Sequence, residues 1–357
     1  MNQEPHEKTG LLLDARRSVL AEAVTARHYE LKPELAERYG PEGRAKCLQD
    51  AGYHLSYLSE AVAARRRVLF ADYVAWAKVL LAGYNVPEKD LIDNLIVLRE
   101  TLNEHLPEDA SHLACEYVDF GIKALAAAPS ALSSLIDENN LLADLARQYL
   151  DLLLKGQRAD ASRLILAAVD SGALVKDIYL QVFQPAQHEI GRLWQTNEIS
   201  VAQEHYATAA TQMIMSQLYP HIFNSERNNR TLVATCVSGD LHEIGVRMVS
   251  DFFEMEGWDT FYLGANTPHQ SFVQTLVERR ADLAVISATM TFHVRLVRDL
   301  IDLIHASEEC RRVKIMVGGY PFNVAPDLWQ EVGADAYSPD ALAAVEIANR
   351  LVEQGNW

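Results

Sequence analysis

The feature that most constrains this chain is a regular alternation of short apolar segments and amphipathic segments, which begins at Thr231. The first apolar segment, residues 231–237, is rich in β-branched side chains, as expected for a strand buried on both faces. Further strands are predicted at residues 260–263, 283–287, 314–317 and 336–337. Each predicted strand is followed by a predicted helix, and this alternation favours a parallel sheet covered on both faces. We therefore predict a five-stranded Rossmann-like (flavodoxin-like) domain over residues 230–357.

The part of the chain before this domain is predicted to be helical throughout and to form two further units. Residues 1–128 show helical periodicity that is broken at four proline-containing sites, with no strand signal. Residues 129–224 contain four helical stretches, and short loops at Gly156 and Gly172 favour a four-helix bundle. The predicted fold class is therefore multidomain, with an all-helical N-terminal module, a four-helix bundle and an α/β domain.

Composition limits the partners and the compartment of the protein. A formal net charge of −17 disfavours a broad nucleic-acid surface, because phosphate binding needs clustered cations. No run of 18 apolar residues is present, so no membrane span is expected. The four cysteines lie far apart, which argues against a disulfide framework and a structural zinc site. The polar N-terminus lacks the pattern of a secretory signal, and we predict a cytoplasmic protein.

The loop after the first predicted strand carries the side chains best suited to bind a ligand. It contains Asp240 and His242, followed by Gly245 at the start of a predicted helix. Ligands of open parallel sheets bind at the carboxyl ends of the strands, so His242 is expected in that crevice. A histidine there can bind a metal while Asp240 accepts a hydrogen bond from its other ring nitrogen. For this loop alone, a capping aspartate beside an incidental histidine is the alternative.

Two later strand ends fall on the same edge of the predicted sheet. There are 41 residues between Gly245 and Ser287, which ends the third strand, and Gly318-Gly319 closes the fourth strand. Glycines let the backbone approach a large ligand closely, and Ser287 offers a hydroxyl where a bulkier side chain would obstruct the ligand.

This three-part pattern resembles the base-off, His-on cobalamin-binding domain of methionine synthase, corrinoid proteins, some mutases and cobalamin photoreceptors. The resemblance implies that His242 is the lower axial ligand of cobalt, and that the nucleotide tail of the cofactor lies beside the serine and the glycines. Thr289 departs from the family pattern, which more often has leucine there. The implied cofactor-binding residues are Asp240, Leu241, His242, Glu243, Ile244, Gly245, Ser287, Thr289, Gly318, Gly319 and Tyr320.

The predicted bundle carries a second motif, Trp194 followed after nine residues by Glu204-His205. This arrangement resembles light-sensing regulators of the CarH and LitR type, in which a bundle covers the upper face of adenosylcobalamin. The resemblance implies that the tryptophan packs at the adenosyl group, with the Glu-His pair nearby. Gln195 stands where some of these regulators have a histidine that binds cobalt after illumination, which puts that light state in doubt.

The N-terminal module lacks the helix-turn-helix with which those regulators begin. The combination instead resembles photocobilins in architecture, which implies biliverdin as a second ligand. The candidate bilin residues are Tyr53, His54, Tyr57, Arg65 and Arg66. The alternatives are a haem in place of the bilin, or no ligand, since aromatic stripes of this sort are usually part of a hydrophobic core.

These resemblances together predict a light sensor that binds adenosylcobalamin and biliverdin and has no catalytic residues of its own. It is expected to form a light-dependent homo-oligomer and to regulate a separate or fused effector, without direct contact with nucleic acid or membrane. The alternative is a corrinoid methyl carrier of a methyltransferase system, in which the same histidine supports methyl transfer. A helical adaptor with a degenerate sheet domain is a third interpretation, which the intact motif residues disfavour.

Overall fold

The computed structural model of the protein describes residues 4–129, 131–223 and 226–353. Three of the predicted domain limits, residues 1, 224 and 357, lie outside these ranges. The chain forms two compact units. One unit contains the N-terminal helices together with Ala288–Asp299 and Gly319–Gly333, and the other contains most of the remaining chain.

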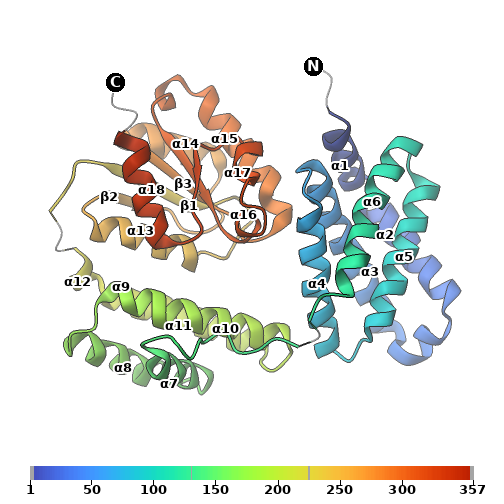
Figure 1. The fold of residues 1–357 in the computed structure, drawn as a ribbon, viewed down its shortest axis with the longest axis horizontal. Helices are drawn as coiled ribbons and strands as arrows, with labels where there is room; N and C mark the ends of the chain where they lie inside the picture. Colours follow the sequence, from blue (N-terminus) through green and yellow to red (C-terminus); the bar gives the residue numbers. More distant parts are fainter. Residues whose placement is uncertain (1–3, 130, 224–225, 354–357) are drawn as a thin grey trace. The chain divides into compact units, whose positions relative to one another are not determined.

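The N-terminal helices follow one another through short turns (Figure 1). They are α1 (Pro5–Ala15), α2 (Arg17–Leu31), α3 (Glu34–Ala63), α4 (Arg67–Gly83), α5 (Glu88–His105) and α6 (Glu108–Leu125). The predicted proline breaks fall at helix ends, except that α3 kinks at Gly40, where φ is 64°. Arg65, expected inside a helix, lies in the turn between α3 and α4, because it adopts a left-handed conformation with φ of 55°.

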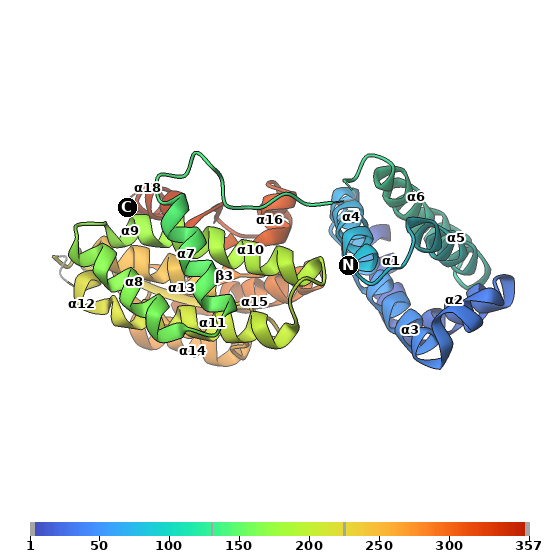
Figure 2. The ribbon, with the colours of Figure 1, turned by 90° about the horizontal axis from the view of Figure 1, so that it is seen from below.

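The second unit begins with the predicted four-helix bundle. Its first, second and fourth helices are α7 (Ala143–Leu154), α8 (Arg158–Asp170) and α11 (Val201–Gln217). The third is a continuous helical segment made of α9 (Val175–Ile178), η1 (Tyr179–Phe183) and α10 (Gln184–Gln195). Figure 2 shows α7, α8, α10 and α11 side by side. The first helix of the bundle begins only at Ala143, because Asp137 and Asn140 accept hydrogen bonds from the backbone two residues ahead and form turns. A short α12 (Tyr219–Ile222) follows the bundle.

The sheet has five parallel strands in the order β2-β1-β3-β4-β5, which confirms the predicted fold class. The strands are β1 (Thr231–Cys236), β2 (Asp259–Tyr262), β3 (Leu283–Ser287), β4 (Lys314–Gly318) and β5 (Ala336–Tyr337). Helices α13 (Ile244–Met255) and α18 (Ala341–Glu353) contact each other on one face (Figure 1). The other connections contain α14 (His269–Arg279), η2 (Thr291–His293), α15 (Val294–Ala306), η3 (Glu308–Cys310), α16 (Tyr320–Val324) and α17 (Leu328–Glu331).

The strand order reverses direction between β1 and β3, and this topological switch point is where ligands bind in open α/β sheets. The chain leaves β1 towards β2 on one side and returns to β3 on the other side. The crevice outside the carboxyl ends of these two strands is therefore the place at which the fold favours a ligand.

One continuous hydrophobic core joins the bundle to the α13 face of the sheet. Tyr149, Tyr179 and Phe183 of the bundle belong to the same buried cluster as Phe252 and Trp258. All five side chains are almost completely inaccessible to solvent. Because apolar burial is the main favourable term in folding, the bundle and the sheet of this unit are expected to stabilise each other. In the described part of the chain, no helix is both long and apolar enough to cross a membrane.

Candidate functional site

The loop between β1 and α13 presents one histidine in a fixed orientation. Nδ1 of His242 lies 2.8 Å from Oδ1 of Asp240, and the same oxygen accepts the backbone N–H of His242 at 3.0 Å. The Asp240 side chain is completely buried, whereas that of His242 is 61% exposed. Since the carboxylate holds the ring proton at Nδ1, the lone pair of Nε2 is free for a ligand. Asp240 does not cap α13, whose N-cap residue is Glu243, so the capping interpretation of this loop is wrong.

The hydrogen bond from His242 to Asp240 also raises the pKa of the imidazole, and burial opposes this effect only in part. The carboxylate stabilises positive charge on the ring, which also makes Nε2 a better donor of electrons to a metal.

The loop after β2 fixes the position of Asp240. Asn266 accepts a hydrogen bond from the backbone N–H of Gly239 at 2.8 Å and donates its own N–H to the carbonyl of Asp240 at 3.1 Å. Asn266 adopts a left-handed conformation with φ of 53°, which asparagine tolerates better than most residues. Asn266 was not identified from the sequence, although an Asn-Thr-Pro turn directly after a strand could have indicated it.

Ser287 and Gly318 meet the end of β1 in a single row across the sheet. The strand register pairs Cys236 with Ser287 and Ser287 with Gly318. Three predicted parts of the site, the loop after Cys236, the serine and the first glycine, therefore share one edge. Gly245 lies at the first turn of α13, and a Cβ added to it would meet no atom within 4 Å. The backbone of this helix start is thus open to a large ligand.

Thr289, Gly319 and Tyr320 follow β3 and β4 and group with the helical unit. Gly319 has φ of 102°, and a Cβ there would lie 2.0 Å from the carbonyl oxygen of Ala288. Only glycine fits this position without a shift of the backbone. Tyr320 donates a hydrogen bond to Asp72 at 3.1 Å, and burial is the main reason that the pKa of its hydroxyl is raised.

The bundle contributes Trp194 from α10 and the neighbouring pair Glu204 and His205 from α11. Trp194 is half-buried, and His205 is exposed and forms an ion pair with Glu204. The charge of Glu204 acts on His242 and contributes to its raised pKa, which places α11 close to the His242 loop within the same unit. Of the three bundle residues, Glu204 is thus the one that the structure brings close to His242.

A polar chain that the sequence did not reveal joins α11 to this loop. Gln212 donates a hydrogen bond to Oε1 of Glu243 at 2.8 Å, and Tyr262 donates to Oε2 of the same carboxylate at 2.8 Å. Glu243 is the residue directly after His242, so the chain positions the loop between the bundle and β2. Burial and the neighbouring Glu243 carboxylate raise the pKa of Tyr262, so its hydroxyl keeps its proton.

One of the candidate bilin residues, His54, lines a cavity of the helical unit that Tyr53, Tyr57, Arg65 and Arg66 do not line. His54 lies in a cavity of the helical unit, with its Nδ1 2.8 Å from the Tyr73 hydroxyl, and burial lowers its pKa to about 4. Tyr57 stacks on Tyr73 at 3.7 Å between ring centroids, and Tyr53 is half exposed. The two candidate arginines are held in ion pairs, Arg65 with Glu4 and Arg66 with Asp327 and Glu331.

The residues of the sheet edge fit a corrinoid with a histidine as its lower ligand. His242 presents Nε2 with its tautomer fixed by a buried carboxylate, and Gly245 leaves the space beside its backbone empty. Residues 230–346 match a family model described as a B12 binding domain, and residues 145–219 match a second model with the same description. The fold and the site thus define a B12-binding protein.

Named relatives extend this assignment. The chain is 35% identical over 129 residues to dimethylamine corrinoid protein 3 of Methanosarcina acetivorans, a match that covers 36% of this chain and 59% of that protein. It is 34% identical over 122 residues to dimethylamine corrinoid protein 3 of Methanosarcina mazei, covering 34% of this chain and 71% of that protein. The chain belongs to the corrinoid-protein family.

The fold of a solved corrinoid protein agrees with this assignment. The monomethylamine corrinoid protein of Methanosarcina barkeri superposes with a TM-score of 0.53 at 24% identity, over 59% of this chain and 99% of that chain. At this identity the likeness concerns the fold alone.

The prediction of a light sensor is wrong. The named relatives are methylamine corrinoid proteins, and they favour the alternative of a methyl carrier. The inference of light sensing from the motif Trp194 to His205 was wrong because the motif lies within residues 145–219, which match a general B12-binding model. The motif therefore indicates a bundle that accompanies a corrinoid, and not a response to light.

Proposed function

We propose that the protein is a corrinoid methyl carrier, which binds a corrinoid through His242 and presents it to separate methyltransferase proteins. The observation that carries this proposal is the His242–Asp240 pair at the switch point of the sheet, close to Glu204 of the bundle. A bound corrinoid supplies the chemistry, since its cobalt can accept and release a methyl group. The protein itself acts as a carrier and has no catalytic residues in this proposal.

The residues of the site have separate tasks in this function. Asp240 keeps the proton of His242 at Nδ1, so that Nε2 binds the metal in one orientation. Gly245 lets the backbone of α13 approach the cofactor. Trp194 and Glu204 belong to the bundle that covers the other side of the cofactor in this proposal, and they exclude water there.

A methylated amine is the proposed source of the methyl group. The names of the relatives, dimethylamine and monomethylamine corrinoid proteins, support this choice. They do not support the adenosyl form of the cofactor or a bilin, and both stay predictions from sequence resemblance. The partners are then the methyltransferases that deliver and remove the methyl group.

A reducing, cytoplasmic compartment is part of the proposal. All four cysteines are free, and the pKa of the Cys236 thiol, 3.3 Å from the carbonyl oxygen of His242, is raised, mainly by burial. A raised pKa keeps this thiol protonated, so it does not compete with His242 for the metal. Homo-oligomer formation, expected from the sequence, stays a prediction.

A methyl-transfer assay tests the proposal. The full chain is loaded with hydroxocobalamin, reduced chemically and exposed to radioactive methyl iodide, and the label retained per corrinoid is counted after gel filtration. We expect about one methyl group per corrinoid. A methylamine-corrinoid methyltransferase should then transfer this methyl group to a methylamine or thiol acceptor. A protein that binds corrinoid but neither gains nor releases the label would contradict the proposal.

A further inference from the structure

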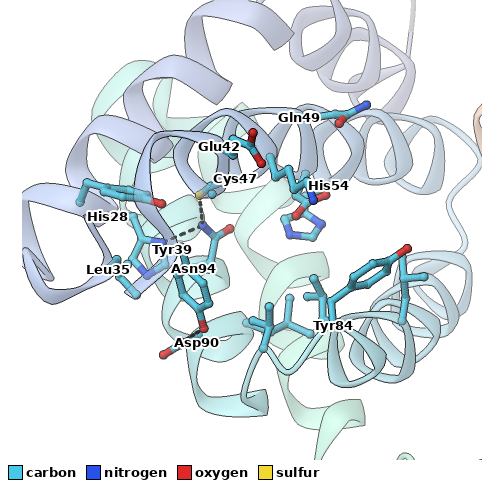
Figure 3. Close-up of a pocket in the computed structure, with 18 residues that line it drawn as sticks. His28, Leu35, Tyr39, Glu42, Cys47, Gln49, His54, Tyr84, Asp90 and Asn94 are labelled. Carbon is cyan, nitrogen blue, oxygen red and sulfur yellow. Dashed lines mark hydrogen bonds between the residues drawn. The ribbon is translucent and has the colours of Figure 1, made fainter. Parts of the chain in front are cut away.

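The helical unit contains a cavity that the corrinoid site does not use. It lies among α2, α3, α4 and α5 and has a volume of about 430 Å³ (Figure 3). This volume is within the range of small-molecule sites, roughly 300–1,000 Å³. Its wall includes the aromatic rings of Tyr29, Tyr39 and Tyr84 and the apolar side chains of Leu80 and Leu81. The cavity therefore combines apolar and aromatic surface with a few polar groups, as binding sites for small organic molecules do.

Two buried side chains of the wall have polar atoms without partners. His28 is 4% exposed and Asn94 is 7% exposed. The amide nitrogen of Asn94 donates to Nδ1 of His28 at 3.0 Å and to the Cys47 sulfur at 3.6 Å, as Figure 3 shows. Oδ1 of Asn94 and Nε2 of His28 have no hydrogen-bond partner. A buried polar atom without a partner costs free energy, so these atoms favour a ligand that supplies the missing bonds.

The tautomer of His28 follows from the same contacts. Because Nδ1 accepts the hydrogen bond from Asn94, the proton of the neutral ring is at Nε2. Burial lowers the pKa of His28, so the neutral ring is the stable form near pH 7. This buried pair thus has one donor, Nε2–H of His28, and one acceptor, Oδ1 of Asn94, without a partner.

A carboxylate stands on the same wall without a counter-ion. Cys47, Asp50 and His54 occupy one face of α3 at helical spacing, and all three line the cavity. Asp50 is half-buried, and in the described part of the chain no ion pair or hydrogen bond reaches its side chain. Burial raises its pKa to about 6, and the nearby Lys46 opposes this effect only in part. The group is therefore ionised near pH 7 and poorly compensated.

Most other charged groups around the cavity are engaged, and the lining carboxylate Glu42 is exposed to solvent. Arg38 pairs with Asp90 at 2.8 Å. Arg44 and Lys46 lie over the rings of Tyr29 and Tyr84, at 5.6 and 5.8 Å from the ring centroids. These contacts show that the tyrosine rings of the wall attract cations. Of the two lining carboxylates that have no ion pair or hydrogen bond in the described part of the chain, Glu42 is exposed and Asp50 is half-buried, so Asp50 is the less compensated by water.

We propose that this cavity binds a small organic ammonium ion, whose N–H groups donate to Asp50 and Asn94 and whose apolar body lies against Leu80 and Leu81. The His28 Nε2–H group then adds selectivity for ligands that carry an acceptor near the ammonium group. This site is independent of the proposed methyl-carrier function, because none of its residues belongs to the His242 loop or the bundle.

A charge series tests the proposal by calorimetric titration of the full-length chain. The probes are tryptamine as the cation, tryptophol as a neutral molecule of similar shape, and indole-3-acetate as the anion. Butylamine and benzylamine extend the cation to smaller bodies. We expect at least one of the three amines to bind, and its affinity to exceed that of the matched neutral alcohol at least tenfold. Indole-3-acetate is expected to bind still more weakly.

Two isosteric substitutions locate the binding. Asp50→Asn keeps the size of the side chain and removes its charge, so it should lower the affinity for the amine at least tenfold and abolish the preference over the alcohol. Asp109→Asn, at an exposed position on α6, serves as the control and should bind as the wild type does. The proposal would be overturned if no amine bound, if the alcohol or the anion bound as tightly as the amine, or if Asp50→Asn bound unchanged.

Discussion

Asp240 is the residue on which the orientation of His242 depends, since one carboxylate oxygen accepts both the ring and the backbone N–H of the histidine. Asp240→Asn keeps an acceptor but removes the charge that strengthens the imidazole as a ligand. We expect corrinoid affinity to fall about 10- to 100-fold, measured by absorbance titration with hydroxocobalamin. Asp144→Asn, whose side chain is 94% exposed, is the control. Equal affinities of the two variants would show that Asp240 does not orient the metal ligand.

A substitution at Gly245 is expected to affect the stability of the fold and the affinity for the corrinoid differently. An added Cβ meets no atom within 4 Å, and alanine favours a helix over glycine, so Gly245→Ala should raise the free energy of unfolding by about 0.5 kcal/mol or leave it unchanged. If the empty space is used by the cofactor, corrinoid affinity should nevertheless fall. Gly52→Ala on α3 also meets no atom within 4 Å and is the control, with unchanged affinity expected. Normal corrinoid binding by Gly245→Ala would mean that the cofactor does not approach this part of α13.

Helix α13 is the element that connects the bundle to the site. Tyr179 of the bundle donates to Asp251 at 2.8 Å, and Arg247 donates to Ser216 at 2.7 Å. Together with the bond from Gln212 to Glu243, these bonds join the start and the middle of α13 to the bundle. Because the same helix begins at the His242 loop, we expect a change in the packing of the bundle to reach His242 through this helix.

The buried carboxyl of Asp251 gives this connection a pH dependence. Burial is the largest cause that raises its pKa, to about 6. A raised pKa means that the folded state favours the protonated form of the carboxyl group. The contribution of Asp251 to the free energy of unfolding is therefore present at low pH and is lost as the pH rises through about 6. Between pH 5 and pH 7.5 the wild type should lose about 1 kcal/mol of unfolding free energy at this group.

The substitution Asp251→Asn should remove this loss, because the amide stays neutral and still accepts the Tyr179 hydroxyl. Urea unfolding at the two pH values measures the change in the free energy of unfolding. Hydrogen exchange of the α13 amides measures the same change locally. Asp302→Asn, at an exposed position on α15, is the control and should keep the dependence of the wild type. An identical pH dependence in Asp251→Asn and the wild type would contradict the assignment.

At the scale of the whole molecule, a bound corrinoid should stabilise the unit that holds it. A ligand that binds only the folded state adds about 2.7 kcal/mol at a free concentration of 100 times its Kd. We therefore expect the apoprotein to melt at a lower temperature than the loaded protein, measured by differential scanning calorimetry with and without hydroxocobalamin. Identical melting curves in excess cofactor would contradict binding at a folded site.

The sheet and the lower side of the site could be predicted from the sequence because they depend on local patterns. Alternating apolar segments predicted all five strands, and parallel strands bring Ser287 and Gly318 to the same edge as the loop that holds His242. Asn266, Gln212 and Tyr262 could not be predicted, because their roles depend on contacts between segments far apart in the chain. The function was missed for a different reason. Trp194, Glu204 and His205 lie in residues 145–219, which match a model described only as a B12 binding domain, and a fold does not by itself specify an activity.

The most direct test of the central claim is electron paramagnetic resonance of the reduced, cobalt(II) form of the loaded protein. The chain is labelled uniformly with ¹⁵N and loaded with unlabelled cobalamin, so that a nitrogen from the protein splits each cobalt line into two and the nucleotide base of the cofactor splits it into three. We predict doublets in the labelled wild type and their loss in His242→Ala. Triplets in the labelled wild type would show that the nucleotide base, and not His242, binds the cobalt.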